Sequence, residues 1–337
     1  MVKSSDFVQE TQPLCDPYRD FDNRLMPKLY PDKQISVAKE TISLILYSYG
    51  ITDSSYEVID RGIENTSLYI QTQDKKYVLR VHRQGKRDEN ISFQLAFQNY
   101  LRKHGIPIPR IYSNTDGKEL TIIEIDGLRW QVILMECAEG ENYTKHYAPE
   151  LIHDLASTQA KMHLLGIEYA KKMQGSEKIW TELVDGLAER IQDTPEHTPE
   201  IIGFIERTRS FYYKLNPKLP HGWNQLDLDL EGNVLVKDNK ASAILDFNDL
   251  DYSPCAVCLG YSLWAVLFAD GENVTRQYLA EYIKIRPLTR EEYGALPHIM
   301  LFRNYAVGMI ELLSKPKPEF MQKILQLEKG IPKISFL

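Results

Sequence analysis

Hydrophobic residues follow a helical period in one early segment and then alternate over several short segments. Between Ser36 and Gly50 the apolar positions recur every three to four residues, and the glycine ends the run. Alternating or continuously apolar runs predict three strands next, with Gln73-Asp74-Lys75 as the turn between the second and the third. These strands are expected at residues 56–62, 67–73 and 76–83.

A second helix and three more strands are predicted after this hairpin. Residues 90–105 have helical spacing and end at Gly105, and Pro107 and Pro109 prevent a continuation of the helix. The three further strands are expected at residues 110–114, 120–125 and 129–137. The order β-β-β-α-β-β-β predicts an antiparallel sheet that carries one helix.

The pattern becomes mainly helical after Gly140. Helices are predicted at 149–166, at 200–215 and over much of 259–337, and a β-hairpin interrupts them at 232–249. We therefore expect an α+β fold with two lobes and a cleft between them. The expected parts are a polar, proline-containing extension (1–34), a sheet lobe (35–137) and a helical lobe (138–337).

Composition narrows the classes of function. The 337 residues include 40 Lys and Arg and 47 Asp and Glu, which gives a net charge of −7. An acidic chain is a poor match for non-specific nucleic-acid binding, which needs a basic face. No run approaches the roughly 18 apolar residues of a membrane span, and the N-terminus has no secretory pattern. We expect a cytoplasmic protein that binds neither nucleic acid nor membrane; the sequence indicates no particular oligomeric state.

The four cysteines are too few and too scattered for a disulfide framework. Cys255 and Cys258 have the CxxC spacing, but no second pair follows, and a zinc site needs four ligands. Packed thiols in a reducing compartment are the expected alternative.

The hairpin at 232–249 carries the strongest candidate chemistry. Asn233 opens its first strand and Asp246 ends its second, so the hairpin is expected to bring an amide oxygen and a carboxylate together. Such oxygens suit Mg²⁺. Asp227 and Asp229 lie on the segment before the hairpin, where a carboxylate can accept a hydroxyl proton during phosphoryl transfer. A surface turn rich in Asp and Asn is the alternative.

Three further segments fit a nucleotide site. Arg80 lies within a predicted strand and can pair with phosphates if it faces the cleft, or it can face solvent. The segment from Gly62 through Asn65 to Ser67 links two strands and can offer backbone N–H groups to phosphate, although one glycine in a hairpin is usually only a turn. Residues 133–140 join the two predicted lobes and can offer main-chain groups to a nucleobase.

In this order the motifs resemble those of the aminoglycoside phosphotransferase and choline kinase superfamily, over roughly residues 40–310. The matching segments are Gly62 to Asn65, Tyr77 to Val81, His104 to Pro109, Leu134 to Glu136, Gly232 to Val236 and Ile244 to Asp249. The resemblance implies a bilobal, protein-kinase-like fold and transfer of a phosphoryl group from ATP or GTP to a small hydroxyl-bearing molecule.

The resemblance also implies residue roles. Asp227 would act on the acceptor hydroxyl, Asn233 and Asp246 would hold Mg²⁺, and Arg80 would bind the α- and β-phosphates. The remaining nucleotide contacts would come from the loop residues Gly62 and Asn65 and from main-chain groups of Glu136 and Ala138.

Several positions depart from the family pattern. In the family, the metal-binding asparagine lies five residues after the catalytic aspartate. Here Asn233 lies six residues after Asp227 and four after Asp229. We favour Asp227 as the catalytic aspartate, with one residue inserted before Asn233, and keep Asp229 as the rival. Gln94 stands where the family has the glutamate that pairs with the strand cation, and Cys258 stands where it often has an aspartate. A degenerate nucleotide-binding module with little kinase activity is therefore the second hypothesis. The acceptor is left open among antibiotic, amino alcohol, amino acid and sugar.

Overall fold

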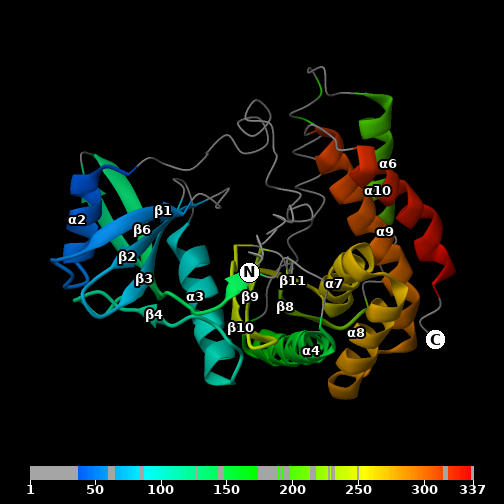
Figure 1. Ribbon diagram of the computed structural model, residues 1–337, viewed down its shortest axis with the longest axis horizontal. Coiled ribbons are helices and arrows are strands. Elements are labelled where there is room, and N and C mark those ends of the chain that lie inside the picture. Colours follow the sequence, from blue (N-terminus) through cyan, green and yellow to red (C-terminus); the bar gives the residue numbers. More distant parts are fainter. Residues whose placement is uncertain are drawn as a thin grey trace, which may run out of the picture.

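The computed structural model describes residues 37–59, 65–82, 87–125, 127–142, 148–173, 189, 192, 198–212, 218–226, 228, 232–248, 250–313 and 318–334. Figure 1 shows a sheet at one end of the molecule, a group of helices at the other, and a set of short strands between them. The predicted α+β class and the sheet-then-helix order are confirmed. The expected N-terminal extension lies outside the described residues.

The large sheet is antiparallel and has six strands in the order β1-β2-β3-β6-β4, with β5 also paired to β6. Its strands are β1 (Ser55–Ile59), β2 (Thr66–Gln71), β3 (Lys76–Val81), β4 (Ile111–Tyr112), β5 (Thr121–Ile125) and β6 (Leu128–Glu136). All six agree with the predicted strands within a few residues. The register pairs Arg80 with Ser67 on one side and with Ile133 on the other, which puts these residues on one face of the sheet.

A helix covers each face of this sheet. Helix α2 (Lys39–Tyr47) packs on the face that carries Leu79 and Val132. Helix α3 (Asp88–Lys103) packs on the opposite face, where Ile133 is buried. Since side chains alternate along a strand, Arg80 belongs to the α3 face. The alternation of side chains along β3 thus determines the face of the sheet on which the guanidinium of Arg80 lies.

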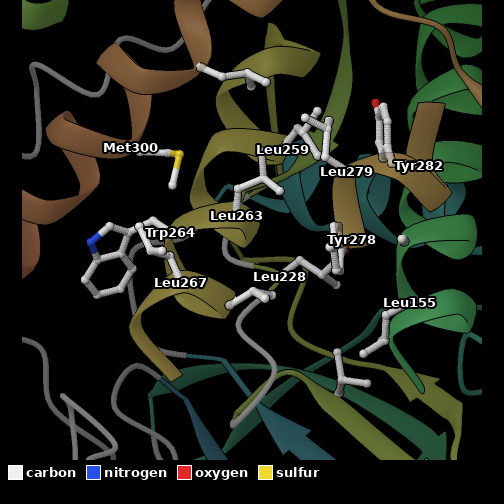
Figure 2. Packing of buried hydrophobic residues seen from close by; sticks show 14 of the residues in the cluster. Leu155, Leu228, Leu259, Leu263, Trp264, Leu267, Tyr278, Leu279, Tyr282 and Met300 are labelled. Atoms are coloured by element: carbon white, nitrogen blue, oxygen red, sulfur yellow. The ribbon is translucent and has the colours of Figure 1, made fainter. Parts of the chain in front are cut away.

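The helical part is built on one large apolar core. Its helices are α4 (Pro149–Lys172), α6 (Pro199–Tyr212), α7 (Cys255–Asp270), α8 (Glu272–Ile285), α9 (Arg290–Leu313) and α10 (Pro318–Gly330), followed by the short η1 (Ile331–Lys333). Figure 2 shows α7 residues such as Leu259 and Leu263 packed among residues from neighbouring helices. Leu228, from the segment before the hairpin, belongs to the same core.

The predicted hairpin is present as β9 (Val234–Lys237) and β10 (Lys240–Ile244). Its two central residues, Asp238 and Asn239, both have positive φ, as the favoured two-residue hairpin turn requires. The short strand β7 (Glu141–Asn142) pairs with β9 and was not expected from the sequence. It ties the segment that follows the large sheet to the hairpin.

A second small sheet was also not expected. Strand β8 (His221–Gln225) pairs with β11 (Leu250–Pro254), so the residues just before and just after the hairpin region are held side by side. Strand β8 lies directly on helix α4: a Cβ added at Gly166 would be 2.1 Å from the carbonyl oxygen of Trp223. On the other side of this contact, a Cβ added at Gly222 would be 2.8 Å from the backbone nitrogen of Ile167. Both positions therefore require glycine.

Aromatic rings join α3 to the helical part. Phe93 on α3 contacts Trp223 on β8, with ring centroids 4.4 Å apart. Phe97, one turn later, contacts Tyr169 on α4 at 5.1 Å. These contacts connect the helix beneath Arg80 with the strand that leads to Asp227.

Candidate active site

The hairpin brings Asn233 and Asp246 to the same end. Ile244 pairs with Val234, and the N–H of Leu245 donates to the carbonyl oxygen of Asn233 at 2.7 Å. Asp246 follows one residue later, so the two candidate metal ligands lie at adjacent strand ends. The juxtaposition that the hairpin pattern predicts for these two residues is therefore present in the backbone.

Arg80 points to this hairpin end from the large sheet. Its Nη1 lies 3.3 Å from Oδ1 of Asp246, and its side chain is only 19% exposed, while that of Asp246 is 35% exposed. The alternative that Arg80 faces solvent is wrong. Its Nε is buried and has no hydrogen-bond partner among the described residues. A buried N–H group without an acceptor is unfavourable, and a phosphate oxygen is an acceptor that suits a guanidinium.

Asp246 adopts a left-handed backbone conformation, with φ of 52°. This conformation costs a non-glycine residue on the order of 1–3 kcal/mol, so surrounding contacts must hold it. The Nε2 of Gln225 donates to the carbonyl oxygen of Asp246 at 2.9 Å, and the N–H of Asn248 donates to its Oδ1 at 3.3 Å. Together with Arg80, these groups determine where the carboxylate lies.

Gln94 does not replace the family glutamate in the expected way. Its Nε2 donates to the carbonyl oxygen of Asn248 at 3.4 Å, whereas Arg80 pairs with Asp246. Glu89, near the start of α3, is exposed and pairs with Arg87 and not with Arg80. The expected contact from α3 to Arg80 is thus replaced by a contact from α3 to the segment after Asp246. An uncharged amide can bind a carbonyl oxygen, and a carboxylate cannot, which explains the new partner.

The candidate bases Asp227 and Asp229 lie outside the described residues, as does Gly62. The two neighbours of Asp227 are described. Leu226 is buried against α7 residues, and Leu228 is buried in the large helical core. Asn65, within the candidate phosphate loop, is also buried.

The segment after β6 was expected to meet the nucleobase through main-chain groups. The N–H of Glu136 donates to the carbonyl oxygen of Arg110 at 2.8 Å, and its carboxylate accepts from the N–H of Arg110 at 3.0 Å. The amide of Glu136 is therefore already used within the protein. The prediction that Glu136 and Ala138 meet a base through main-chain groups therefore cannot use the N–H of Glu136.

A metal ion at this site would have a small protein ligand set. No group of three or more His, Cys, Asp or Glu residues suited to a metal occurs in the part of the chain that the structure describes. Asn233 and Asp246 supply one amide and one carboxylate, which are hard oxygen donors that suit Mg²⁺ when phosphate oxygens complete its coordination. The residues present fit a magnesium–nucleotide complex.

Several other cysteine, histidine and aromatic residues have structural roles. Burial raises the pKa of the Cys255 thiol to about 12, and Cys258 is buried and hydrogen-bonded, so the pair consists of packed thiols. His163 is buried against the hydroxyl of Tyr282, and burial together with the charge of Arg286 lowers its pKa well below the ordinary range. His153 is exposed and pairs with a glutamate on α8. On α7, Tyr261 and Trp264 are buried, and Phe268 packs partly buried against the helical core.

Comparison with known proteins identifies the family. The model of the phosphotransferase enzyme family matches residues 55–296, which contain β1 to β11 and all the described candidate site residues. The chain belongs to this family. This phosphotransferase is an ATP-dependent small-molecule kinase, and the family assignment agrees with the sequence-based hypothesis.

Relatives of this phosphotransferase include proteins named homoserine kinase. The one from Bradyrhizobium diazoefficiens is 27% identical over 286 residues, which are 81% of this chain and 83% of the relative. The one from Rhodospirillum rubrum is 29% identical over 252 residues, 71% of this chain and 74% of the relative. The chain therefore matches most of the length of these relatives.

Solved structures show the same fold. A microcompartment-associated aminopropanol kinase has a TM-score of 0.68 at 17% identity and covers 87% of this chain and 95% of its own. A spectinomycin phosphotransferase in complex with ADP and spectinomycin has a TM-score of 0.61 at 15% identity, with 89% and 99% covered. Within the described residues, none of the helices combines the length and the apolar character needed to cross a membrane.

Proposed function

We propose that this phosphotransferase transfers the γ-phosphoryl group of Mg²⁺–ATP to the hydroxyl of homoserine, in the cytoplasm, where Cys255 and Cys258 stay reduced. The convergence of Arg80, Asn233 and Asp246 carries the kinase part of the proposal, since it joins a cation, an amide and a carboxylate from distant parts of the chain. The curated relatives named homoserine kinase support the acceptor, because they match most of this chain.

The proposed reaction assigns each residue a task. Asp227 accepts the proton of the acceptor hydroxyl, whose oxygen forms a bond to the γ-phosphorus while the bond to the bridging β–γ oxygen breaks and ADP leaves. Arg80 binds phosphate oxygens with its guanidinium. Asn233 and Asp246 hold Mg²⁺, which neutralises phosphate charge when bound. The backbone near Gly62 and Asn65 approaches the phosphates, and the carbonyl of Glu136 and the groups of Ala138 meet the base.

A panel of acceptors tests this proposal. ADP release should be measured with ATP and Mg²⁺ against L-homoserine, 1-amino-2-propanol, choline, ethanolamine, kanamycin and spectinomycin. We expect kcat/KM for homoserine to exceed the other values by at least about tenfold, which corresponds to roughly 1.4 kcal/mol of discrimination. A preference for an amino alcohol or an antibiotic would reject homoserine as the acceptor and keep the kinase. Nucleotide binding without turnover of any acceptor would favour the degenerate module.

A further inference from the structure

Asp246 is joined to the interior of the helical part by hydrogen bonds that pass through Gln225. The side-chain amide of Gln225 donates to the carbonyl oxygen of Asp246 at 2.9 Å. The carbonyl oxygen of Gln225 itself accepts from the thiol of Cys258, on α7, at 3.0 Å. Gln225 ends β8 and lies two residues before Asp227, so it touches both the proposed metal ligand and the segment that carries the proposed base.

The same path continues into the helical core. The Nε2 of Gln159, on α4, lies 3.4 Å from the sulfur of Cys258 and donates to Oγ of Ser262 at 2.7 Å. The hydroxyl of Tyr278, on α8, donates to Oε1 of Gln159 at 3.0 Å. Helices α4, α7 and α8 therefore converge on one buried group of polar side chains.

The hydrogen bonds between these side chains are strengthened because they are buried. Gln159, Gln225, Cys258 and Tyr278 are all almost completely buried, so water does not compete for their hydrogen bonds. Every one of these side chains is an uncharged hydrogen-bonding group. Gln225 is therefore fixed at its carbonyl by α7, and its amide is directed to a residue whose backbone conformation is unfavourable without support.

We propose that Gln225 and Cys258 are positioning residues for Asp246: Cys258 fixes the end of β8, and Gln225 holds the Asp246 backbone so that its carboxylate is oriented to bind a divalent cation with the nucleotide. The inference rests on the proposed function, because it takes Asp246 as a metal ligand. Both side chains are buried, so they act through Asp246. Groups that orient a metal ligand typically change metal affinity or activity about 10–100-fold when they are replaced.

Cation binding without turnover tests the role of Gln225. Mn²⁺ binding would be followed by electron paramagnetic resonance in the presence of AMP-PNP, on protein shown to be folded by circular dichroism. Gln225→Met keeps the length of the side chain and removes the donor, and we expect it to weaken Mn²⁺ binding about 10–100-fold. In steady-state assays the same variant should lower kcat and leave KM for the acceptor nearly unchanged. The matched control is Thr208→Val, which removes a buried hydrogen bond to the carbonyl of Phe204 on α6 and should leave Mn²⁺ binding unaltered.

A second pair of variants keeps the test decisive if Gln225→Met does not fold. Cys258→Ser keeps a donor and should bind Mn²⁺ nearly as the wild type does, whereas Cys258→Ala should bind it several-fold more weakly. Equal Mn²⁺ affinity in the wild type and in folded Gln225→Met or Cys258→Ala would overturn the positioning role and leave the kinase function intact. Wild-type protein that neither binds Mn²⁺ with AMP-PNP nor phosphorylates any acceptor would instead reject the proposed function.

Discussion

Arg80 on β3 and Asp246 after β10 form an ion pair, although 166 positions separate them in the sequence. The pair links the large sheet to the hairpin that carries the proposed metal ligands. Arg80 reaches it from the α3 face of the sheet, with its Nε still lacking an acceptor among the described residues. Under the proposed function, phosphate oxygens supply that acceptor, so nucleotide binding and the position of Asp246 are coupled through one side chain.

Replacement of Arg80 should weaken nucleotide binding. A charge-assisted contact to phosphate contributes roughly 1.5–3 kcal/mol, so Arg80→Ala should raise the dissociation constant of Mg²⁺–ATP about tenfold to a hundredfold. Isothermal titration calorimetry on folded protein measures this change. Arg80→Lys is the control, because it keeps the charge and loses the planar fork, and it should give an intermediate value. An unaltered dissociation constant for Arg80→Ala would place the phosphates elsewhere.

The proposed metal ligand should be essential for turnover. Asp246→Asn keeps the shape of the side chain and removes the charge that would balance a phosphate-bound cation. We expect turnover to fall on the order of 10²-fold or more, because electrostatic stabilisation is usually the largest single contribution to phosphoryl transfer. The measurement is kcat as a function of Mg²⁺ concentration. Near-wild-type kcat with the same Mg²⁺ dependence would show that the cation binds at another site.

Replacement of the two candidate bases should lower turnover to very different extents. Asp227→Ala should remove most turnover and leave nucleotide binding largely intact, because the residue acts on the acceptor hydroxyl. Asp229→Ala should lower turnover much less. General-base contributions run to about 10²–10⁴-fold, so kcat values for the two variants are easily ranked with homoserine or whichever acceptor is found. The opposite order would assign the base to Asp229, and two mild effects would support the degenerate module.

The contact between α4 and β8 should not tolerate a side chain. Gly166→Ala would put a methyl group 2.1 Å from the carbonyl oxygen of Trp223, and backbone must move to relieve it. We expect a loss of about 1–3 kcal/mol in the free energy of unfolding, measured by urea denaturation. Gly294→Ala, on α9, is the matched control: nothing lies within 4 Å of the new methyl group, and it should stabilise by up to about 1 kcal/mol. Equal stability of the two variants would contradict the close approach.

The buried histidine should make stability depend on pH. Burial, with the charge of Arg286, holds the pKa of His163 well below its ordinary value of 6.5. The unfolded chain therefore binds a proton at this residue below about pH 6.5, while the native protein does not. The free energy of unfolding should fall by up to about 1.4 kcal/mol for each pH unit below that point, until the lowered native pKa is reached.

The variant His163→Gln should show a shallower decrease than the wild type in the same urea titrations. Thr208→Val is the control, since it removes a buried hydrogen bond and no titratable group, and its slope should match that of the wild type. Parallel wild-type and His163→Gln curves would mean that other groups cause the pH dependence.

The sequence predicts those helices, strands and turns that are determined by residues close to one another in the chain. The alternation of β1 to β6, the helical period of α2 and α3, and the turn at Asp238 and Asn239 are each encoded within a few residues. Strand β8 is different: His221 to Gln225 has little apolar alternation and is held by pairing with β11 and by contact with α4. Such tertiary support leaves no signal in a short window of sequence.

The same distinction applies to the site. The spacing of Asn233 and Asp246 predicts their proximity, because a two-residue turn brings the second strand back beside the first. The register shift between Ala241 and Ala243, which moves the pairing by one residue, could not be predicted from this spacing. The partner of Gln94 could not be predicted from the helix that carries it, because Asn248 lies 154 residues away. The link from Gln225 to Asp246 likewise depends on where a separate strand ends.

The ring contacts around Trp223 give the protein an intrinsic optical reporter. Its indole touches Phe93 on α3, and its N–H donates to the carbonyl oxygen of Met173 just after α4. An indole in this position senses the packing and polarity of the junction between the sheet and the helices. A nucleotide or an acceptor that changes this junction should therefore alter its fluorescence emission, and the difference between the wild type and Trp223→Phe separates this signal from that of the other three tryptophans.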